Sequence, residues 1–470
     1  MTMTFPDHPY LTGHYAPSGV EQDAADLLIE GRIPARLAGN FYRNGPDPQF
    51  PPHPDDDYHP FDGDGMIYSF TLGGGTASLR NRWVRTPKFL DERAAGKRLY
   101  GVFGNPRFND PAADPARYDT ANTHIWPHAG RLFALMEGCP PTELDPQTLD
   151  TIGYETFGGE AAGPFTAHPK LDPGTGELFA FGWGAKGPGS KALRYNVISA
   201  DGRTAKTQWL EQPYCSMMHD MVLTENYVVF PCLPLTMSME RAMQGKPPTA
   251  WESDKPAYFG IMPRYGDASE LRWIEADPTF AFHVAGAHER PDGEIVIEVA
   301  GSDQAPLMPN SEGRLPSAAA SRMTLRRWIV AADRNSVREE TLDDMAMQFP
   351  RIDDRVNGRR YRTVFFNGAK HADSVRKDGF DTIGAYDLER NSRATHSVAG
   401  GFYGEPVFVP RHGGVEGEGH VLATLWQPDK QVSSLDIFDA RAIGDGPVAR
   451  VVSPTRIPAG FHCSWRAAGS

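Results

Sequence analysis

The chain has 470 residues, a formal net charge of −13 and a hydrophobic content of 40%. This acidic balance argues against nucleic acid as a partner, because binding to phosphates needs an excess of Lys and Arg on one face. The 48 glycines and 41 prolines are spread along the whole chain, which is typical of many short strands joined by turns. We therefore expect a single domain over residues 1–470.

The N-terminal segment 1–10 contains neither the basic nor the apolar region of a secretory signal. The longest apolar stretch, residues 227–235, is too short to span a bilayer. The cysteines form no CxxC pair and are expected to be free thiols; they are Cys139, Cys215, Cys232 and Cys463. These features predict a cytoplasmic protein.

In chain order, helical patterns are expected at residues 23–30 and again at residues 237–244. The rest of the chain is typical of strands and turns. The clearest strand-like runs are residues 178–182, 227–230, 294–300, 361–366, 406–410 and 420–426.

A period of roughly 65 residues would divide the chain into about seven units, each large enough for a four-stranded blade. The pattern therefore predicts an all-β protein, with a β-propeller favoured. No strict sequence repeat is visible, so a large sandwich or a two-barrel protein remains an alternative.

Four histidines lie in short segments typical of the inner end of a strand: His168, His219, His283 and His462. The first two intervals between them are roughly sixty residues long, and the last is about three times as long. In a propeller the innermost strands face a central channel, so such residues can converge. Four neutral imidazoles would suit iron, zinc, copper or nickel.

Any one of these histidines taken alone fits a buried or surface side chain equally well. Four others compete as ligands on this evidence: His124, His128, His288 and His371. Metal-bound histidines usually donate their second ring N–H to an acceptor. Glu137 and Glu405, each beside a glycine in an apolar run, are the candidate acceptors, and a solvent-facing turn carboxylate is the alternative for each.

An ordered set of motifs covers nearly the whole chain and resembles the carotenoid cleavage oxygenase family, non-haem iron enzymes that split an alkene with dioxygen. These motifs are GNFYRNGPDP at 39–48, PFDGDGM at 60–66, ANT at 121–123, ALMEG at 134–138, TAHPK at 166–170, HD at 219–220, FH at 282–283, FPRID at 349–353, GEPVFVPR at 404–411 and RIPAGFH at 456–462.

The resemblance implies a seven-bladed propeller with a dome of loops and helices over a central iron site. It implies one Fe(2+) per chain, held by the four histidines named above, and no catalytic residue beyond this metal centre. Glu137 and Glu405 match two of the glutamates that orient the ligands, but Gln348 stands in the place of the third. A Gln oxygen can still accept an imidazole N–H, so we expect weaker iron retention or a shifted potential.

The implied reaction adds dioxygen across one double bond and gives two carbonyl products. In the family, enzymes that cleave stilbenes grip a phenol with a tyrosine and a lysine, and Phe103 and Met136 stand at the matching positions. An apolar pair there favours a polyene, because a buried phenol would lose its hydrogen bonds to water. We therefore expect a carotenoid or apocarotenoid substrate in the substrate tunnel. A stilbene or phenylpropenoid of the lignostilbene or isoeugenol type is the alternative, and Tyr100 could then supply the hydroxyl.

A polyene dissolved in a membrane would need an apolar entrance, and residues 231–239 with the helix that follows could form a patch for peripheral membrane contact. Packing within the dome is the alternative.

The segment 61–65 lacks the remaining ligands of a calcium loop and is expected to be a structural turn. Two other classes remain: a propeller that only binds proteins, and a calcium or zinc hydrolase.

Overall fold

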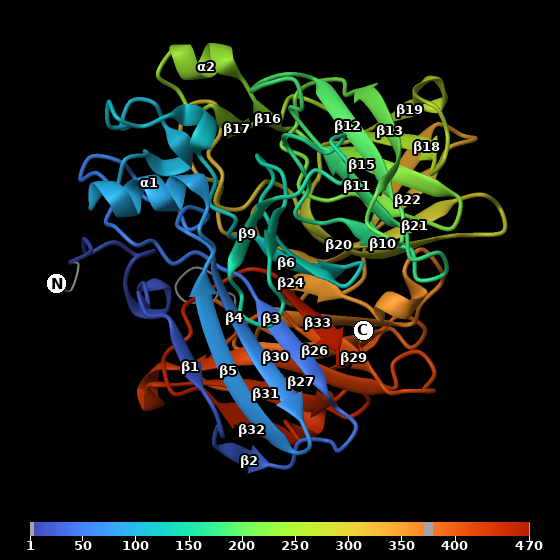
Figure 1. The fold of residues 1–470 in the computed structure, drawn as a ribbon. Helices are drawn as coiled ribbons and strands as arrows, with labels where there is room; N and C mark the ends of the chain where they lie inside the picture. The colour runs from blue at the N-terminus through green and yellow to red at the C-terminus, as the bar shows by residue number, and fades with distance from the viewer. Residues whose placement is uncertain (1–3, 371–378, 470) are drawn as a thin grey trace.

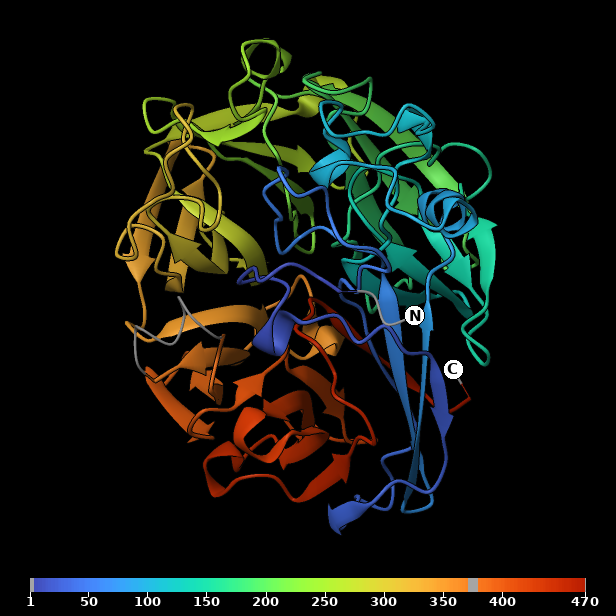
Figure 2. The ribbon, with the colours of Figure 1, turned by 90° about the vertical axis from the view of Figure 1, so that its left-hand side faces the viewer.

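The computed structural model describes residues 4–370 and 379–469. Seven sheets of four to six strands follow one another around a central axis, and a two-stranded ribbon is added to them. Figure 2 shows the sheets as a ring in the order of the chain, with N-terminal segments and loops crossing the middle. The expected seven-bladed propeller is therefore confirmed.

The first sheet contains β1 (Gln22–Ala24), β5 (Thr76–Trp83), β4 (Met66–Gly73), β3 (Gly39–Arg43) and β33 (Cys463–Ala467). The second contains β6 (His124–His128), β7 (Arg131–Leu135), β8 (Thr142–Leu144) and β9 (Thr151–Tyr154). The third contains β10 (Lys170–Leu171), β11 (Leu178–Gly182), β12 (Ala192–Ile198) and β13 (Thr204–Glu211). The fourth contains β14 (Val222–Leu223), β15 (Tyr227–Cys232), β18 (Ala257–Pro263) and β19 (Arg272–Ala276), and the ribbon of β16 (Leu235–Met237) and β17 (Thr249–Trp251) extends from it.

The fifth sheet contains β20 (Phe280–Glu289), β21 (Ile295–Ser302), β22 (Thr324–Ala331) and β23 (Ser336–Thr341). The sixth contains β24 (Ala346–Arg351), β25 (Thr363–Ala369), β26 (Thr382–Asp387) and β27 (Ser392–Ser397). The seventh contains β2 (Ile29–Gly31), β32 (Ala449–Val452), β31 (Val432–Asp439), β30 (Gly419–Gln427), β28 (Phe402–Tyr403) and β29 (Val407–Pro410).

The two ends of the chain close the ring. β33, near the C-terminus, pairs antiparallel with β3, and β2, near the N-terminus, pairs antiparallel with β32. Each end therefore completes a sheet begun by the other, which protects strand edges that would otherwise be open. The same closure brings His462, directly before β33, to the central axis.

Two short α-helices, α1 (Pro87–Ala95) and α2 (Met239–Met243), belong to the dome on one face of the propeller. They lie on the left-hand side of Figure 1, the side that faces the viewer in Figure 2. The hydroxyl of Thr86 accepts a hydrogen bond from the backbone N–H of Phe89 and so caps α1. Gly96, with a φ of 65°, ends the helix in the left-handed conformation that favours glycine.

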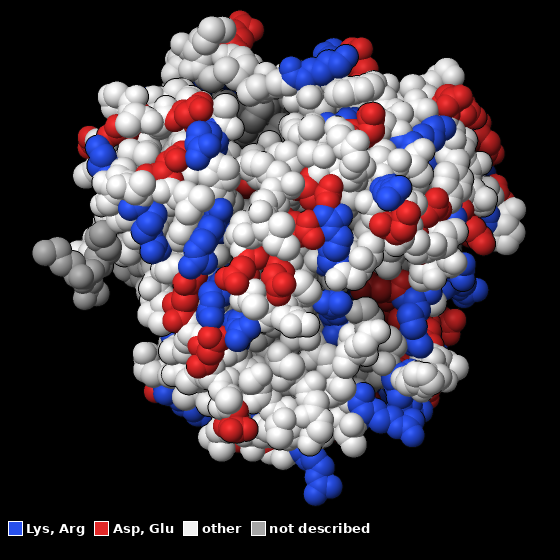
Figure 3. All heavy atoms as spheres, viewed as in Figure 1, with Lys and Arg blue, Asp and Glu red and all other residues white. Residues whose placement is uncertain are grey.

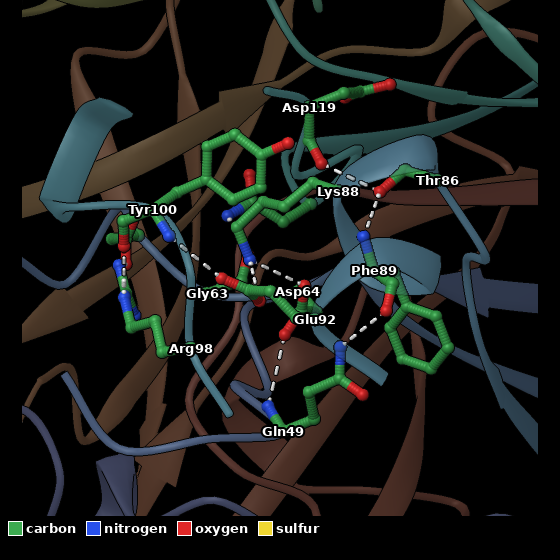
Figure 4. A network of polar contacts seen from close by, with 12 residues as sticks. Gln49, Gly63, Asp64, Thr86, Lys88, Phe89, Glu92, Arg98, Tyr100 and Asp119 are labelled. Carbon is green, nitrogen blue, oxygen red and sulfur yellow. Dashed lines mark hydrogen bonds and ion pairs between the residues drawn. The ribbon is translucent and has the colours of Figure 1, made fainter. Parts of the chain in front are cut away.

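A buried ion-pair network fixes α1 to the segment 61–65 (Figure 4). The ammonium of Lys88 lies 2.8 Å from a carboxylate oxygen of Asp64 and 2.8 Å from one of Glu92, and all three side chains are buried. Asp62 forms an ion pair with Arg98 and accepts a hydrogen bond from the hydroxyl of Tyr118. Both aspartates of this segment are therefore paired with cationic side chains of the chain itself, in agreement with the expected structural turn.

Each of the strand-like runs falls on a strand, whereas one of the two expected helices is wrong. The six strand-like runs fall on β11, β15, β21, β25, β29 and β30, and the second expected helix overlaps α2. The expected helix at residues 23–30 is wrong, because these residues contain β1 and β2, which pair with β5 and β32. Pairing with partners far along the chain overrides the local helical preference there.

Candidate metal centre

Four imidazole nitrogens converge on the propeller axis. The Nε2 atoms of His168 and His219 are 2.9 Å apart, those of His219 and His283 are 3.2 Å apart, and those of His283 and His462 are 3.1 Å apart. One ligand atom from each ring lies within 4.8 Å of all the others. The structure therefore brings together the four histidines that the sequence singled out.

The strand ends hold these histidines in place. His283 lies on β20, while His168, His219 and His462 lie in irregular segments shortly before β10, β14 and β33. The pairing of β20 with β21 shifts register on both sides of Val284, so the strand bends where His283 projects inward.

One buried aspartate ties three of these segments together. The carboxylate of Asp220 lies 2.7 Å from the ammonium of Lys170 and accepts a hydrogen bond of 2.9 Å from the backbone N–H of Val284. Asp220 directly follows His219, Val284 directly follows His283, and Lys170 lies two residues after His168. The contact fixes the spacing of three imidazoles, and no local sequence pattern indicates it.

Three polar side chains accept the outer N–H groups of the rings. His219 donates through Nδ1 to Glu137, His283 to Gln348 at 3.0 Å, and His462 to Glu405 at 3.0 Å; Glu137, Gln348 and Glu405 are the three expected acceptors. The second oxygen of Glu137 accepts a 2.7 Å hydrogen bond from the indole of Trp183. The second oxygen of Glu405 accepts one from the backbone N–H of Cys463.

Burial disfavours protonation of three of the four rings. Burial lowers the pKa of His168, His283 and His462 well below the ordinary value, and neighbouring imidazoles lower it further. A neutral ring that donates through Nδ1 has a bare lone pair on Nε2. Lone pairs so close together repel one another unless a cation lies between them, so the donor set fits a bound metal ion.

The competing histidines lie outside this cluster. The Nδ1 of His124 is 2.6 Å from the carbonyl oxygen of Ala167, so this buried ring, although it packs beside His168, makes a backbone contact instead. His128 contacts the carbonyl oxygen of Ser199 at 3.0 Å, and His288 does not belong to the group. His371 lies outside the described residues.

Aromatic rings pack beside the cluster. The ring of Phe282 lies 5.2 Å from that of His219, and the ring of Phe61 lies 5.9 Å from Phe282 and 5.6 Å from Phe461. Phe349, whose backbone has a left-handed φ of 48°, brings its ring to 5.0 Å from His283. These rings form apolar walls beside the imidazoles.

The two expected tunnel residues differ in position. Phe103 is 53% exposed, whereas Met136 is half-buried and its sulfur lies 2.9 Å from the backbone nitrogen of Gly138.

The expected membrane patch is wrong in part, because Leu233 and Leu235 are buried in the core and cannot contact a bilayer. Of the nearby helix α2, Met243 is 80% exposed.

The surface gives two further observations. In residues 4–370 and 379–469, no helix combines the length and the apolar character needed to cross a membrane. On the face drawn in Figure 3, Lys and Arg side chains are interleaved with Asp and Glu, without an extended basic stripe among the described residues.

Comparison with known proteins identifies the family. The model of the retinal pigment epithelial membrane protein family, which includes the carotenoid cleavage oxygenases, matches residues 15–467. The chain belongs to this family. Its members are iron-dependent oxygenases that cleave alkenes, so the chain is an oxidoreductase, and its four-histidine cluster could bind the metal.

Relatives named for different activities resemble the chain over nearly its full length. It is 34% identical to isoeugenol monooxygenase of Pseudomonas nitroreducens, over 97% of this chain and 98% of that protein. The crystal structure of Pseudomonas brassicacearum lignostilbene dioxygenase superposes with a TM-score of 0.94 at 35% identity, covering 99% of this chain and 100% of that one. Cobalt-substituted Synechocystis ACO superposes with a TM-score of 0.85 at 28% identity, covering 99% and 100%.

Proposed function

We propose that the chain is an Fe(II)-dependent dioxygenase that cleaves the carbon–carbon double bond of an aryl alkene, of the stilbene or phenylpropenoid type, into two carbonyl products. The observation that carries the proposal is the similarity to the lignostilbene dioxygenase structure, with a TM-score of 0.94 against 0.85 for the Synechocystis enzyme. A carotenoid or apocarotenoid, the class expected from the sequence, becomes the second candidate.

In this proposal His168, His219, His283 and His462 hold one Fe(II) per chain. Bound ferrous iron would supply the site at which dioxygen is activated. Glu137, Gln348 and Glu405 keep the imidazoles oriented by accepting their Nδ1–H groups, as the contacts described above support.

The aromatic rings would position the substrate. Phe61 and Phe282 meet edge to face, 5.9 Å apart, and Phe282 lies against His219. A flat aryl alkene packs well against such rings, because edge-to-face and offset contacts between aromatic groups are favourable. The double bond nearest the metal would react, so these contacts would select the bond that is cleaved. The chemistry requires no general acid or base from the chain.

A specific observation favours the second candidate. Phe103 and Met136 are apolar at the positions where the stilbene-cleaving members have their tyrosine and lysine, so neither can grip a phenol. A polyene such as an apocarotenoid would not need that grip. If the substrate is dissolved in a membrane, the exposed Met239 and Met243 of α2 would be available for peripheral contact.

We treat residues 1–470 as a single catalytic domain, since β2 and β33 bind the two ends of the chain into neighbouring sheets. The test is incubation of iron-loaded enzyme under oxygen with 4-hydroxystilbene, isoeugenol and an apocarotenal, with mass spectrometry of the products. Aldehydes from the aryl alkenes, absent in a His219→Ala control, support the proposal. Cleavage of the apocarotenal alone would overturn it in favour of the second candidate.

A further inference from the structure

A continuous series of aromatic rings leads from the protein surface to the metal centre. It begins at the exposed ring of Phe103, whose centroid lies 4.9 Å from that of His59. His59 lies 4.7 Å from Phe61, which contacts Phe282, and Phe282 contacts His219. His59 is the polar ring between the exposed end of this series and the cluster.

The hydrogen bonds of His59 determine which nitrogen carries its proton. Burial lowers the pKa of His59 to about 4, although the carbonyl of Leu307 opposes this shift, so the ring is neutral near pH 7. Its Nδ1 accepts a 3.2 Å hydrogen bond from the backbone N–H of Phe61. A neutral imidazole that accepts at Nδ1 has its proton on Nε2.

The Nε2–H group of His59 is a donor with a weak partner. It faces the carbonyl oxygen of Leu307 at 3.4 Å, longer than an ordinary N–H to oxygen contact. Leu307 is 38% exposed and has a left-handed φ of 66° in the loop between β21 and β22. An oxygen atom of a bound molecule at a shorter distance would therefore be a better acceptor.

We propose that His59 determines substrate specificity by donating its Nε2–H to an oxygen substituent on the aryl ring of the alkene. This assignment rests on the proposed function, and it supplies a polar contact that Phe103 and Met136 cannot make. An aryl ring lying against Phe61 would place its double bond toward Phe282 and the cluster, and its oxygen toward His59.

The test compares 4-hydroxystilbene with 4-methylstilbene, which has a similar shape but no acceptor. We expect wild-type enzyme to prefer the hydroxy compound in kcat/KM by about tenfold, the usual value of one such hydrogen bond. His59→Asn should abolish that preference. An Asn oxygen can accept the N–H of Phe61 in place of Nδ1, as Asn310 accepts the N–H of Glu312, but it does not reproduce the donor at Nε2.

His53 provides a matched control. It also lies beside a dome phenylalanine, Phe108, at 5.3 Å, and its Nδ1 accepts a 3.2 Å hydrogen bond from the backbone N–H of Asp55. His53→Asn should retain the full preference for 4-hydroxystilbene. Binding of both compounds under nitrogen, measured by fluorescence titration, should show the same loss of discrimination in His59→Asn with unchanged iron content.

The outcomes separate the two proposals. Cleavage of neither stilbene by iron-loaded wild-type enzyme overturns the proposed function and this assignment with it. Cleavage of both at equal efficiency, or an undiminished preference in His59→Asn, overturns the role of His59 and leaves the proposed function standing. An effect of His59→Asn confined to an apocarotenal, whose oxygen is a terminal aldehyde, overturns the aryl assignment.

Discussion

The Nδ1 of His283 lies 3.0 Å from the side-chain oxygen of Gln348, whereas Glu137 and Glu405 accept the corresponding N–H groups of two other rings. The amide nitrogen of Gln348 lies 2.8 Å from the sulfur of Met323. An amide orients the imidazole but, unlike a carboxylate, adds no negative charge to the surroundings of a metal ion.

Replacing this amide by a carboxylate should change iron binding and stability in opposite directions. We expect Gln348→Glu to bind Fe(II) about tenfold more tightly and to lower the Fe(III)/Fe(II) potential. The metal-free variant should lose about 1–3 kcal/mol of unfolding free energy, because one buried oxygen would face the Met323 sulfur. Adding Met323→Gln, which supplies a donor, should restore the stability. Iron titration and urea unfolding measure the two effects; unchanged iron affinity and turnover would contradict the role given to Gln348.

Metal content should depend on the cluster and not on histidines in general. We expect His219→Ala to reduce iron from one ion per chain to a small fraction of that, because the variant loses a metal ligand together with the contact that Glu137 makes to it. His128→Ala, which changes a histidine bonded to the backbone of Ser199, should retain full iron. Elemental analysis of both folded proteins checks this, and equal iron in the two would refute the assignment.

Much of the fold could be predicted because turn signals and apolar runs mark strands locally. The run at residues 178–182 coincides with β11, whose residues are all buried. β1 and β2 could not be predicted in this way, since they are edge strands of three residues each that are defined by pairing with β5 and β32, far along the chain. The helix α1 was missed because two of its charged residues, Lys88 and Glu92, are buried, which leaves no clear apolar stripe.

The histidines of the site could be predicted, but the contacts that space them could not. Each histidine lies in a recognisable segment at a strand end. The bond from Val284 to Asp220, and the ion pair of Asp220 with Lys170, join residues from three blades. Nothing in the local sequence distinguishes Lys170 and Asp220 from surface charges. Likewise, the role of His59 depends on rings that are brought together only by the fold.

Acid should destabilise the chain through buried neutral histidines. Burial, together with Arg43 and Arg456, lowers the pKa of His14 to about 3, and its ring stacks on Phe402 at 4.9 Å. Below about pH 6.5 the unfolded chain binds a proton at this residue and the folded chain does not, so stability falls as the pH drops, by about 1.4 kcal/mol per unit.

His14→Phe keeps the stacking and removes this proton. We therefore expect its unfolding free energy to fall less steeply than that of the wild type between pH 6 and pH 4. The two slopes should differ by about 1.4 kcal/mol per pH unit, the contribution of one proton. Urea unfolding of the metal-free proteins at several pH values measures the slope. His53→Phe, at a side chain that is 51% exposed, is the control and should match the wild type. A His14→Phe slope equal to that of the wild type would refute the account.

The ion-pair network beneath α1 should be indispensable to the dome. Burial alone would lower the pKa of Lys88, but Asp64 and Glu92 raise it above its usual range, so the ammonium stays charged. Lys88→Met would leave two carboxylates buried without a counter-charge, at a cost of about 3–5 kcal/mol. Lys97→Met, which removes a surface partner of Asp110, should cost little.

Thermal unfolding of the two variants tests this expectation. Combining Lys88→Met with Asp64→Asn and Glu92→Gln should recover part of the loss, since no charge is then left unpaired. Iron per folded chain should stay at the wild-type level in all of them, because the network lies in the dome and none of its members contacts a histidine of the cluster among the described residues. Equal unfolding temperatures for Lys88→Met and Lys97→Met would show that Lys88 does not hold the dome together.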